Sequence, residues 1–282
     1  MATSVEGHPL VFRDIDVEHI DEAATALEAI YEARSTGLVV RGAFPLELVA
    51  AAVSHLGDDA PWISPNRGLA GGEIRNIGDA ATPTFTHLRG PPTEVYKRSV
   101  ELHAERTAAV FGDADVATHR LQDLLSRLFG GRPASPPAFD ATSSWAAFNF
   151  RALDPGQQIY AHHDSHFGLG VYERLDAALD RTTLLSFFVT LQTPERGGEL
   201  IVYGAWGSEP GVPMLPTRFL DTAAIERRYG RAVITLGAGD LVVFDSGRHV
   251  HRVTPVEGRR ARLTCGGFLT LASDRSHVAF WS

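Results

Sequence analysis

Apolar residues in the first half of the chain recur at helical spacing. Ile20, Ala24, Leu27 and Tyr31 share one face of a predicted helix, with Asp16 as its N-cap and Gly37 as its end. A short apolar strand at 38–41 follows. The segment from 58 to 92 is rich in Gly, Pro, Asn and Asp and is predicted to be a loop. Further helices are expected at 45–57, 93–111 and 115–129.

The pattern changes after GGRPASPP at 130–137, where apolar runs of strand length alternate with turn residues. The predicted strands lie in SSWAAFNFRAL, QIYAHHD, TTLLSFFVTL, GELIVY, RAVITL, DLVVF, RHVHRVT and RARLTCGGFLT. Strands without intervening helices favour a double-sheet architecture such as a jelly roll. We therefore expect an α+β protein with one domain over 1–282. Residues 1–140 would form a mainly helical supporting layer, and 141–272 a jelly-roll core with an insertion at 205–230.

Composition excludes several classes of protein. The 282 residues carry a formal net charge of -8, and Lys97 is the only lysine, so a nucleic-acid partner that depends on phosphate neutralisation is not expected. Cys265 is the only cysteine, which excludes an intrachain disulfide and a thiolate zinc cluster. No apolar run approaches 20 residues and no export signal is evident, so we expect a cytoplasmic protein without a membrane span.

The stretch PGQQIYAHHDSHF places His162 and Asp164 two residues apart. On a strand these side chains point the same way, while His163 faces the other surface. The pattern alone is weak evidence for a metal site. His19 and Asp21 have the same spacing, but on a predicted helix, where residues two apart do not converge.

A third ligand comes from GDLVVFDSGRHVHRVTPVEGRRARLT, in which His249 and His251 share one face. Two histidines and one carboxylate form the facial triad typical of non-haem iron. Arg260 lies nine residues beyond His251, and Arg262 is expected on the same face. An arginine inside a barrel needs an anionic partner, and its planar fork suits a carboxylate.

These segments resemble the iron(II)/2-oxoglutarate-dependent dioxygenases, in particular the prolyl 4-hydroxylase-like branch. The similarity rests on PGQQIYAHHDSHF, LLSFFVTLQTPERGGELIVY and GDLVVFDSGRHVHRVTPVEGRRARLT, which occur in the family's order within 145–270. The resemblance implies a double-stranded β-helix of cupin type, iron(II), 2-oxoglutarate as co-substrate, and dioxygen. It implies His162, Asp164 and His251 as metal ligands and catalytic centre, with Arg260 binding the distal carboxylate of 2-oxoglutarate.

The chain departs from the branch at Leu153 and Ile159, where tyrosines are common, and at Gly266-Gly267, where an aromatic residue is common. Asp164 also bears on the reaction. Halogenating relatives have a small residue in its place and bind halide there, so an aspartate points to hydroxylation or another oxidation.

For the substrate we expect a small molecule, such as an amino-acid derivative or natural product, that is hydroxylated at an unactivated C–H bond while 2-oxoglutarate becomes succinate. His166, Trp206 and Arg218 are candidate substrate contacts, the last two from the insertion at 205–230, which we expect to act as a lid. Two alternatives remain open: a peptidyl prolyl or aspartyl hydroxylase, and a cupin-like metal protein that does not use 2-oxoglutarate. The oligomeric state does not follow from the sequence.

Overall fold

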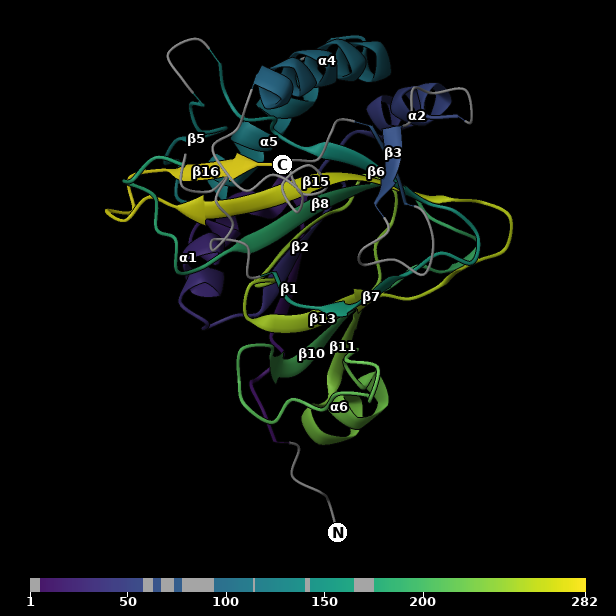
Figure 1. Cartoon of the computed structure of the whole chain (residues 1–282). Helices are drawn as coiled ribbons and strands as arrows, with labels where there is room; N and C mark the ends of the chain where they lie inside the picture. Colours follow the sequence, from purple (N-terminus) through teal and green to yellow (C-terminus); the bar gives the residue numbers. More distant parts are fainter. Residues whose placement is uncertain are drawn as a thin grey trace.

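The computed structural model describes residues 6–57, 63–66, 74–77, 94–113, 115–139, 143–164 and 175–282. In these ranges two sheets face each other, the larger one mainly antiparallel with two parallel strand pairs, and helices cover the outer face of the larger one (Figure 1). The arrangement confirms an α+β protein built on antiparallel sheets. Facing sheets are also what the predicted jelly roll requires.

The larger sheet runs β1-β2-β12-β8-β15-β6-β4-β3, and β16 joins β15 to β5 at one side. Its strands are β1 Phe12–Asp16, β2 Gly37–Arg41, β3 Ile63–Asn66, β4 Ile74–Ile77, β5 Ala134–Ser135, β6 Asn149–Leu153, β8 Leu185–Gln192, β12 Leu241–Phe244, β15 Arg262–Leu271 and β16 Val278–Trp281.

The smaller sheet runs β11-β10-β13-β7, all antiparallel. Its strands are β7 Ile159–His162, β10 Leu200–Trp206, β11 Arg231–Ile234 and β13 His249–Val253. A separate two-stranded ribbon pairs β9 Arg196–Gly197 with β14 Val256–Glu257. The second strand of this ribbon, β14, comes directly before β15 in the chain, so the ribbon helps to set where β15 begins.

Strand alternation decides which side chains face the second sheet. On β8, Leu185, Phe187 and Val189 belong to the main core under the helices, and on β15 Leu263 and Cys265 do the same. The residues between them point the other way, into the space between the sheets. Period-two alternation thus separates an apolar helix-facing side from a side that carries polar groups.

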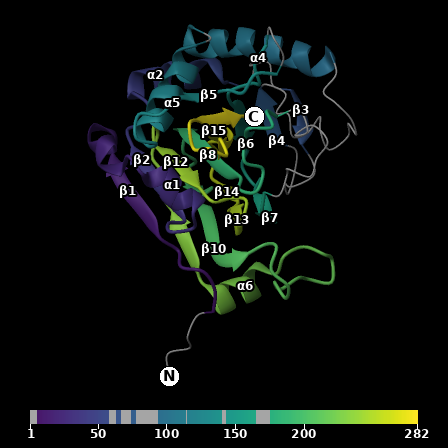
Figure 2. The ribbon, with the colours of Figure 1, turned by 90° about the vertical axis from the view of Figure 1, so that its left-hand side faces the viewer.

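Helices pack on the outer face of the larger sheet and contribute to the same core. Figure 2 shows α2, α4 and α5 together on that side, with α6 at the opposite end of the molecule. Among the described residues, the helices are the 3-10 helix η1 Val17–Ala23 and the α-helices α1 Ala26–Tyr31, α2 Leu46–His55, α4 Glu94–Phe111, α5 Val116–Arg127 and α6 Thr222–Tyr229. None of these helices is both long and apolar enough to cross a membrane.

Three local predictions need correction. The expected helix from Asp16 to Gly37 is a 3-10 helix followed by a short α-helix, and the Asp16 side chain makes no capping hydrogen bond. The chain turns at Ala33, whose φ is 58°, and Gly37 already belongs to β2.

Within the predicted loop at 58–92, the described residues include β3 and β4, which extend the larger sheet through β6. The strands β1 and β16 were not expected.

Candidate active site

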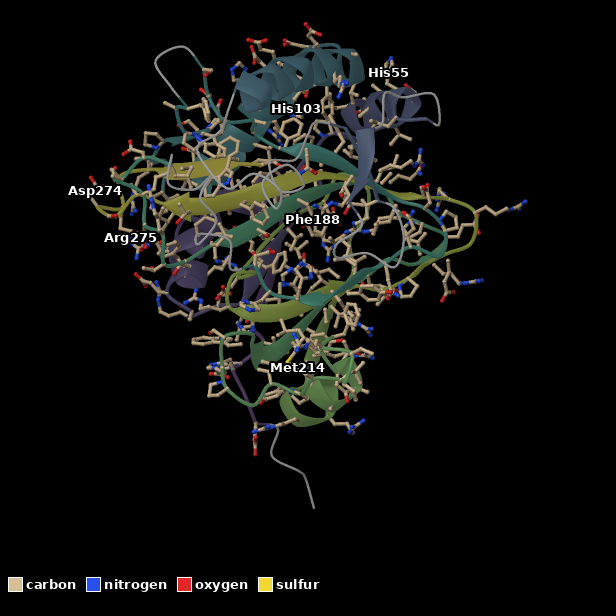
Figure 3. The ribbon with its side chains drawn as sticks, in the orientation of Figure 1. His55, His103, Phe188, Met214, Asp274 and Arg275 are labelled. Atoms are coloured by element: carbon tan, nitrogen blue, oxygen red, sulfur yellow. The ribbon has the colours of Figure 1, made fainter. Side chains whose placement is uncertain are left out.

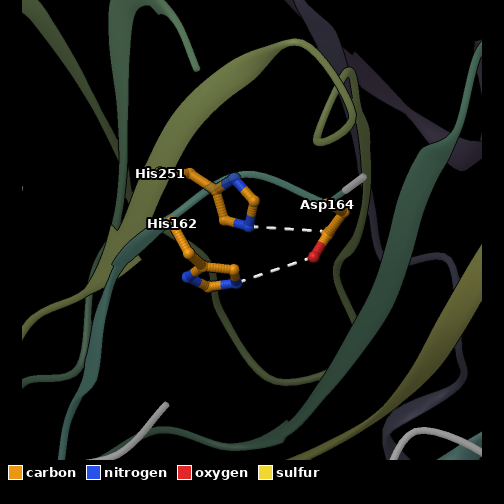
Figure 4. A group of neighbouring side chains, drawn as sticks. All are labelled: His162, Asp164 and His251. Carbon is orange, nitrogen blue, oxygen red and sulfur yellow. Dashed lines mark ion pairs between the residues drawn. The ribbon is translucent and has the colours of Figure 1, made fainter. Parts of the chain in front are cut away.

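The two predicted histidines and the aspartate meet at the edge of the smaller sheet. His162 ends β7 and pairs with His251 on the neighbouring β13. Asp164 follows two residues after His162, and its backbone N–H donates to the carbonyl oxygen of Ser246 at 2.8 Å. One potential ligand atom from each side chain lies within 4.8 Å of the other two (Figure 4). The predicted grouping of these three residues is therefore present in the structure.

Backbone carbonyls fix the orientation of both imidazole rings. Nδ1 of His162 donates to the carbonyl oxygen of Tyr160 at 2.7 Å, and Nδ1 of His251 donates to that of His249 at 3.0 Å. Each ring therefore keeps Nε2 free of its proton and directed toward Asp164. Burial, reinforced by His162, lowers the pKa of His251 to about 3, so this ring is neutral and its lone pair is available at neutral pH.

The carboxylate of Asp164 lies beside both rings, whose centroids are 4.3 Å apart (Figure 4). Its oxygens are 3.6 Å from Nε2 of His162 and 3.7 Å from Nε2 of His251. The hydroxyl of Ser186 on β8 donates to Oδ2 of Asp164 at 2.9 Å and holds the carboxylate from the larger sheet. Two imidazoles and one buried carboxylate match the donor set of a facial triad, so these residues fit iron(II).

A cavity between the sheets opens onto the three ligands. The smaller sheet contributes the ligands and apolar residues. Polar groups of the larger sheet line the opposite wall: Asn149, Arg151, Ser186, Arg262 and Thr264.

Two of these polar residues are arginines on neighbouring strands. Arg262 begins β15 and is 5% exposed, and its guanidinium lies 4.9 Å from the centre of the Phe188 ring. Burial, with repulsion from Arg151, lowers the pKa of Arg262 to about 9. Burial also lowers the pKa of Arg151, and the charge of Asp164 acts against that shift. Neither Arg151 nor Ser186 was predicted from the sequence. Strand alternation in NFRAL could have indicated Arg151, because this residue lies on the face opposite the core residues Phe150 and Ala152.

The structure corrects the position expected for Arg260. This residue lies in the turn before β15, is exposed, and directs its guanidinium toward the carbonyl oxygen of Pro194 at 3.4 Å. It does not line the cavity, whereas Arg262 does. The physical reason is that β14 and the following turn occupy the residues up to Arg260, so β15 begins two residues later than expected.

His249 and His163 lie outside the ligand group, as predicted. Nδ1 of His249 donates to the carbonyl oxygen of Tyr203 at 2.8 Å, and its Nε2 accepts the Trp206 indole N–H at 3.3 Å. Both ring nitrogens are therefore occupied. The ring of His163 lies against Gly207, where a Cβ would come within 2.1 Å of it.

The insertion at 205–230 packs on the outer face of the smaller sheet. Ile225 and Tyr229 of α6 join a core cluster with Tyr203 and Val250. Figure 3 shows Phe188 between the sheets and Met214 beyond the smaller sheet, beside α6.

The predicted substrate contacts are not brought together by the structure. Trp206 stacks on His8 with ring centroids 3.7 Å apart, and Arg218 is exposed, so neither lines the cavity. His166 lies outside the described residues. No residue of 205–230 contributes to the cavity wall that the structure describes.

Comparison with known proteins identifies the family. The family model described as carrier-protein-independent halogenase WelO5 matches residues 10–282. No curated protein matches the chain in sequence.

Several solved structures are similar in fold. An N-substituted L-amino acid dioxygenase in complex with alpha-KG, from Burkholderia ambifaria AMMD, has a TM-score of 0.53 and 16% identity, covering 92% of this chain and 91% of that one. A 2OG-Fe(II) oxygenase family protein from Burkholderia pseudomallei has a TM-score of 0.49 and 13% identity, covering 97% and 100%. A Pseudomonas putida prolyl-4-hydroxylase has a TM-score of 0.43 and 17% identity, covering 89% and 97%.

The chain belongs to the WelO5 halogenase family and, with it, to the iron(II)/2-oxoglutarate-dependent oxygenases. The family prediction made from the three sequence blocks is confirmed. The protein is thus a non-haem iron enzyme that uses 2-oxoglutarate, and the alternative of a cupin-like protein without this co-substrate is set aside.

Proposed function

We propose that this enzyme hydroxylates an unactivated C–H bond of a small molecule and converts 2-oxoglutarate to succinate. The single observation that carries the proposal is the carboxylate of Asp164, which occupies the third corner of the triad. Iron(II), 2-oxoglutarate and dioxygen together supply the oxidising chemistry at such a site. The protein residues hold the metal, bind the co-substrate and exclude water.

Membership of a family described by a halogenase makes halogenation the second candidate function. A halogenating member requires an open position for halide beside the two histidines. In this chain the Asp164 carboxylate lies within 3.7 Å of both Nε2 atoms and is held by Ser186. A buried anion there disfavours a second anion at the same place through repulsion. We therefore favour transfer of oxygen over transfer of halogen.

Arg262 is the residue that we propose binds the distal carboxylate of 2-oxoglutarate, in place of Arg260. It lines the cavity, and β15 places the Thr264 hydroxyl on the same face. A guanidinium can donate two parallel hydrogen bonds to a carboxylate, which lysine cannot. Ion pairing would also offset the cost of burying the Arg262 charge.

Apolar side chains around the ligands would keep the centre dry. The ring of Phe244 lies edge-on to His251 at 5.0 Å, and Phe188, Leu200 and Val253 complete that part of the wall. Excluding water strengthens the electrostatic contacts inside the cavity and limits side reactions.

For the substrate we propose an amino-acid derivative or natural product of modest size. The support is the cavity between the sheets, and the similarity in fold to an N-substituted L-amino acid dioxygenase. A peptidyl prolyl or aspartyl hydroxylase remains the alternative within the class.

Co-substrate binding is tested by adding 2-oxoglutarate to the iron(II) protein without oxygen and recording visible absorption. A weak charge-transfer band should appear and saturate. In Arg262→Lys the band should saturate only at about tenfold higher 2-oxoglutarate, because one charge-assisted hydrogen bond is lost. Arg260→Lys is the matched control and should titrate as the wild type does. Loss in Arg260→Lys with an unchanged Arg262→Lys would contradict the assignment.

A further inference from the structure

The cavity holds two guanidinium groups and a single carboxylate among its described lining residues. Arg151 on β6 pairs with Thr264 on β15, which makes Arg262 its diagonal neighbour across the two strands. Both arginines line the cavity. Neither guanidinium forms a hydrogen bond or ion pair with another side chain or carbonyl group within the part of the chain that the structure describes. Asp164 is the only carboxylate of that lining, and it faces the two histidines.

The charges of the cavity remain unbalanced after the co-substrate is bound. Iron(II) brings two positive charges and the two arginines bring two more, because guanidinium remains protonated in proteins. Asp164 offsets one of these charges, and the 2-oxoglutarate dianion offsets two. One positive charge is therefore left in an enclosed space, where an unpaired charge is costly.

We propose that Arg151 binds a carboxylate of the substrate, so that the enzyme oxidises a carboxylic acid with an apolar body. This inference rests on the proposed function, since it assigns the other arginine to 2-oxoglutarate. A monoanionic acid would bring the charge of the loaded cavity to neutrality. Its apolar part would contact a wall formed by Ile74, Ile159, Leu200, Val253 and Phe268.

Arg151 is better placed for this role than Arg262. Ser186, which holds Asp164, lies opposite Phe268 on β15, whereas Arg151 lies opposite Thr264 and Arg262 is two residues further from Phe268, so the strand register places Arg151 nearer to the metal ligands than Arg262. Arg262 instead interacts with Arg151 and Phe188. A substrate held by Arg151 would thus keep the rest of its carbon skeleton near the metal, while Arg262 takes the far end of the co-substrate.

The first arm of the test separates the two arginines. Titration of the anaerobic iron(II) protein with 2-oxoglutarate should give a wild-type affinity for Arg151→Met and a loss of at least about tenfold for Arg262→Met. Thermal unfolding of both variants checks that they fold. If Arg151→Met weakens 2-oxoglutarate as much as Arg262→Met does, Arg151 belongs to the co-substrate site. The inference then fails while the proposed function stands.

The second arm uses matched pairs of acid and amide: 3-phenylpropanoate with 3-phenylpropanamide, and N-acetyl-L-phenylalanine with its primary amide. Each is added to the anaerobic iron(II)–2-oxoglutarate complex, and the shift of the visible band reports binding. We expect the acids to bind at least about tenfold more tightly than the amides, and Arg151→Met to remove the difference. Equal binding of acid and amide in both pairs, including no binding of either, overturns the inference. Failure of 2-oxoglutarate to bind the wild type would instead overturn the proposed function.

Discussion

Nδ1 of His251 donates a hydrogen bond to the backbone carbonyl oxygen of His249 at 3.0 Å. One histidine thereby orients the other through its main chain, while its own ring nitrogens bind Tyr203 and Trp206. The two histidines share one face of β13 but have different roles. His251 directs Nε2 to the metal position, and His249 fixes the strand behind it.

The first prediction follows from this difference. His251→Ala removes a ligand and should abolish stoichiometric iron binding, as should His162→Ala. His249→Ala keeps the backbone carbonyl that orients His251, so most of the iron affinity should remain. Anaerobic titration with iron(II), followed by metal analysis, measures both. Loss of iron in His249→Ala with retention in His251→Ala would mean that the ligand assignment on β13 is wrong.

Ser186 should tune the metal site without being a ligand. Ser186→Ala removes the hydrogen bond to Oδ2 of Asp164 and leaves the three ligands in place. Loss of such a supporting contact typically weakens metal binding by about 10–100-fold. Competition for iron(II) against a chelator gives the affinity, and Ser186→Thr, which keeps the hydroxyl, should retain more of it. An affinity in Ser186→Ala equal to that of the wild type would show that the hydrogen bond does not support the ligand.

Cys265 should be chemically inert in the folded protein. Burial raises the pKa of this thiol to about 12, so almost no thiolate is present at pH 8. An aromatic disulfide reagent at pH 8 should therefore react only after denaturant is added. Rapid reaction of the native protein would contradict the burial of Cys265 on the helix-facing side of β15.

The insertion provides a test of the lid that the sequence suggested. Because Arg218 is exposed and lies outside the cavity, Arg218→Ala should leave the ratio of oxidised product to succinate unchanged. Measuring both products with a turned-over substrate decides the point. If succinate continues to form while product falls, the insertion takes part in closing the site, as the sequence-based prediction holds.

Much of the catalytic core could be predicted because strand alternation is a local property. The two-residue spacing places His162 and Asp164 together, and the eight predicted strand segments of the second half all contain strands of the structure. The identity of the arginine that lines the cavity, Arg262 and not Arg260, depends instead on where β15 begins. A count from His251 cannot show that β14 pairs with β9 and delays the start of β15 until Arg262.

Other features depend on contacts between distant segments. The place of Arg151 in the cavity depends on the pairing of β6 with β15, and the contact of Ser186 with Asp164 depends on β8 facing the smaller sheet. Neither arrangement can be predicted from the local sequence. The insertion at 205–230 was likewise predicted to be a lid because of its length and its position in the chain. Its apolar residues, Ile225 and Tyr229, pack instead on the outer face of the smaller sheet.

The central claim is that Asp164 directs this enzyme to transfer oxygen although its family is described by a halogenase. The most direct measurement is the mass of the product formed under labelled dioxygen in the presence of chloride and 2-oxoglutarate. The account predicts one labelled oxygen atom in the product, one in succinate, and no chlorine. A chlorinated product from the wild-type enzyme would contradict it.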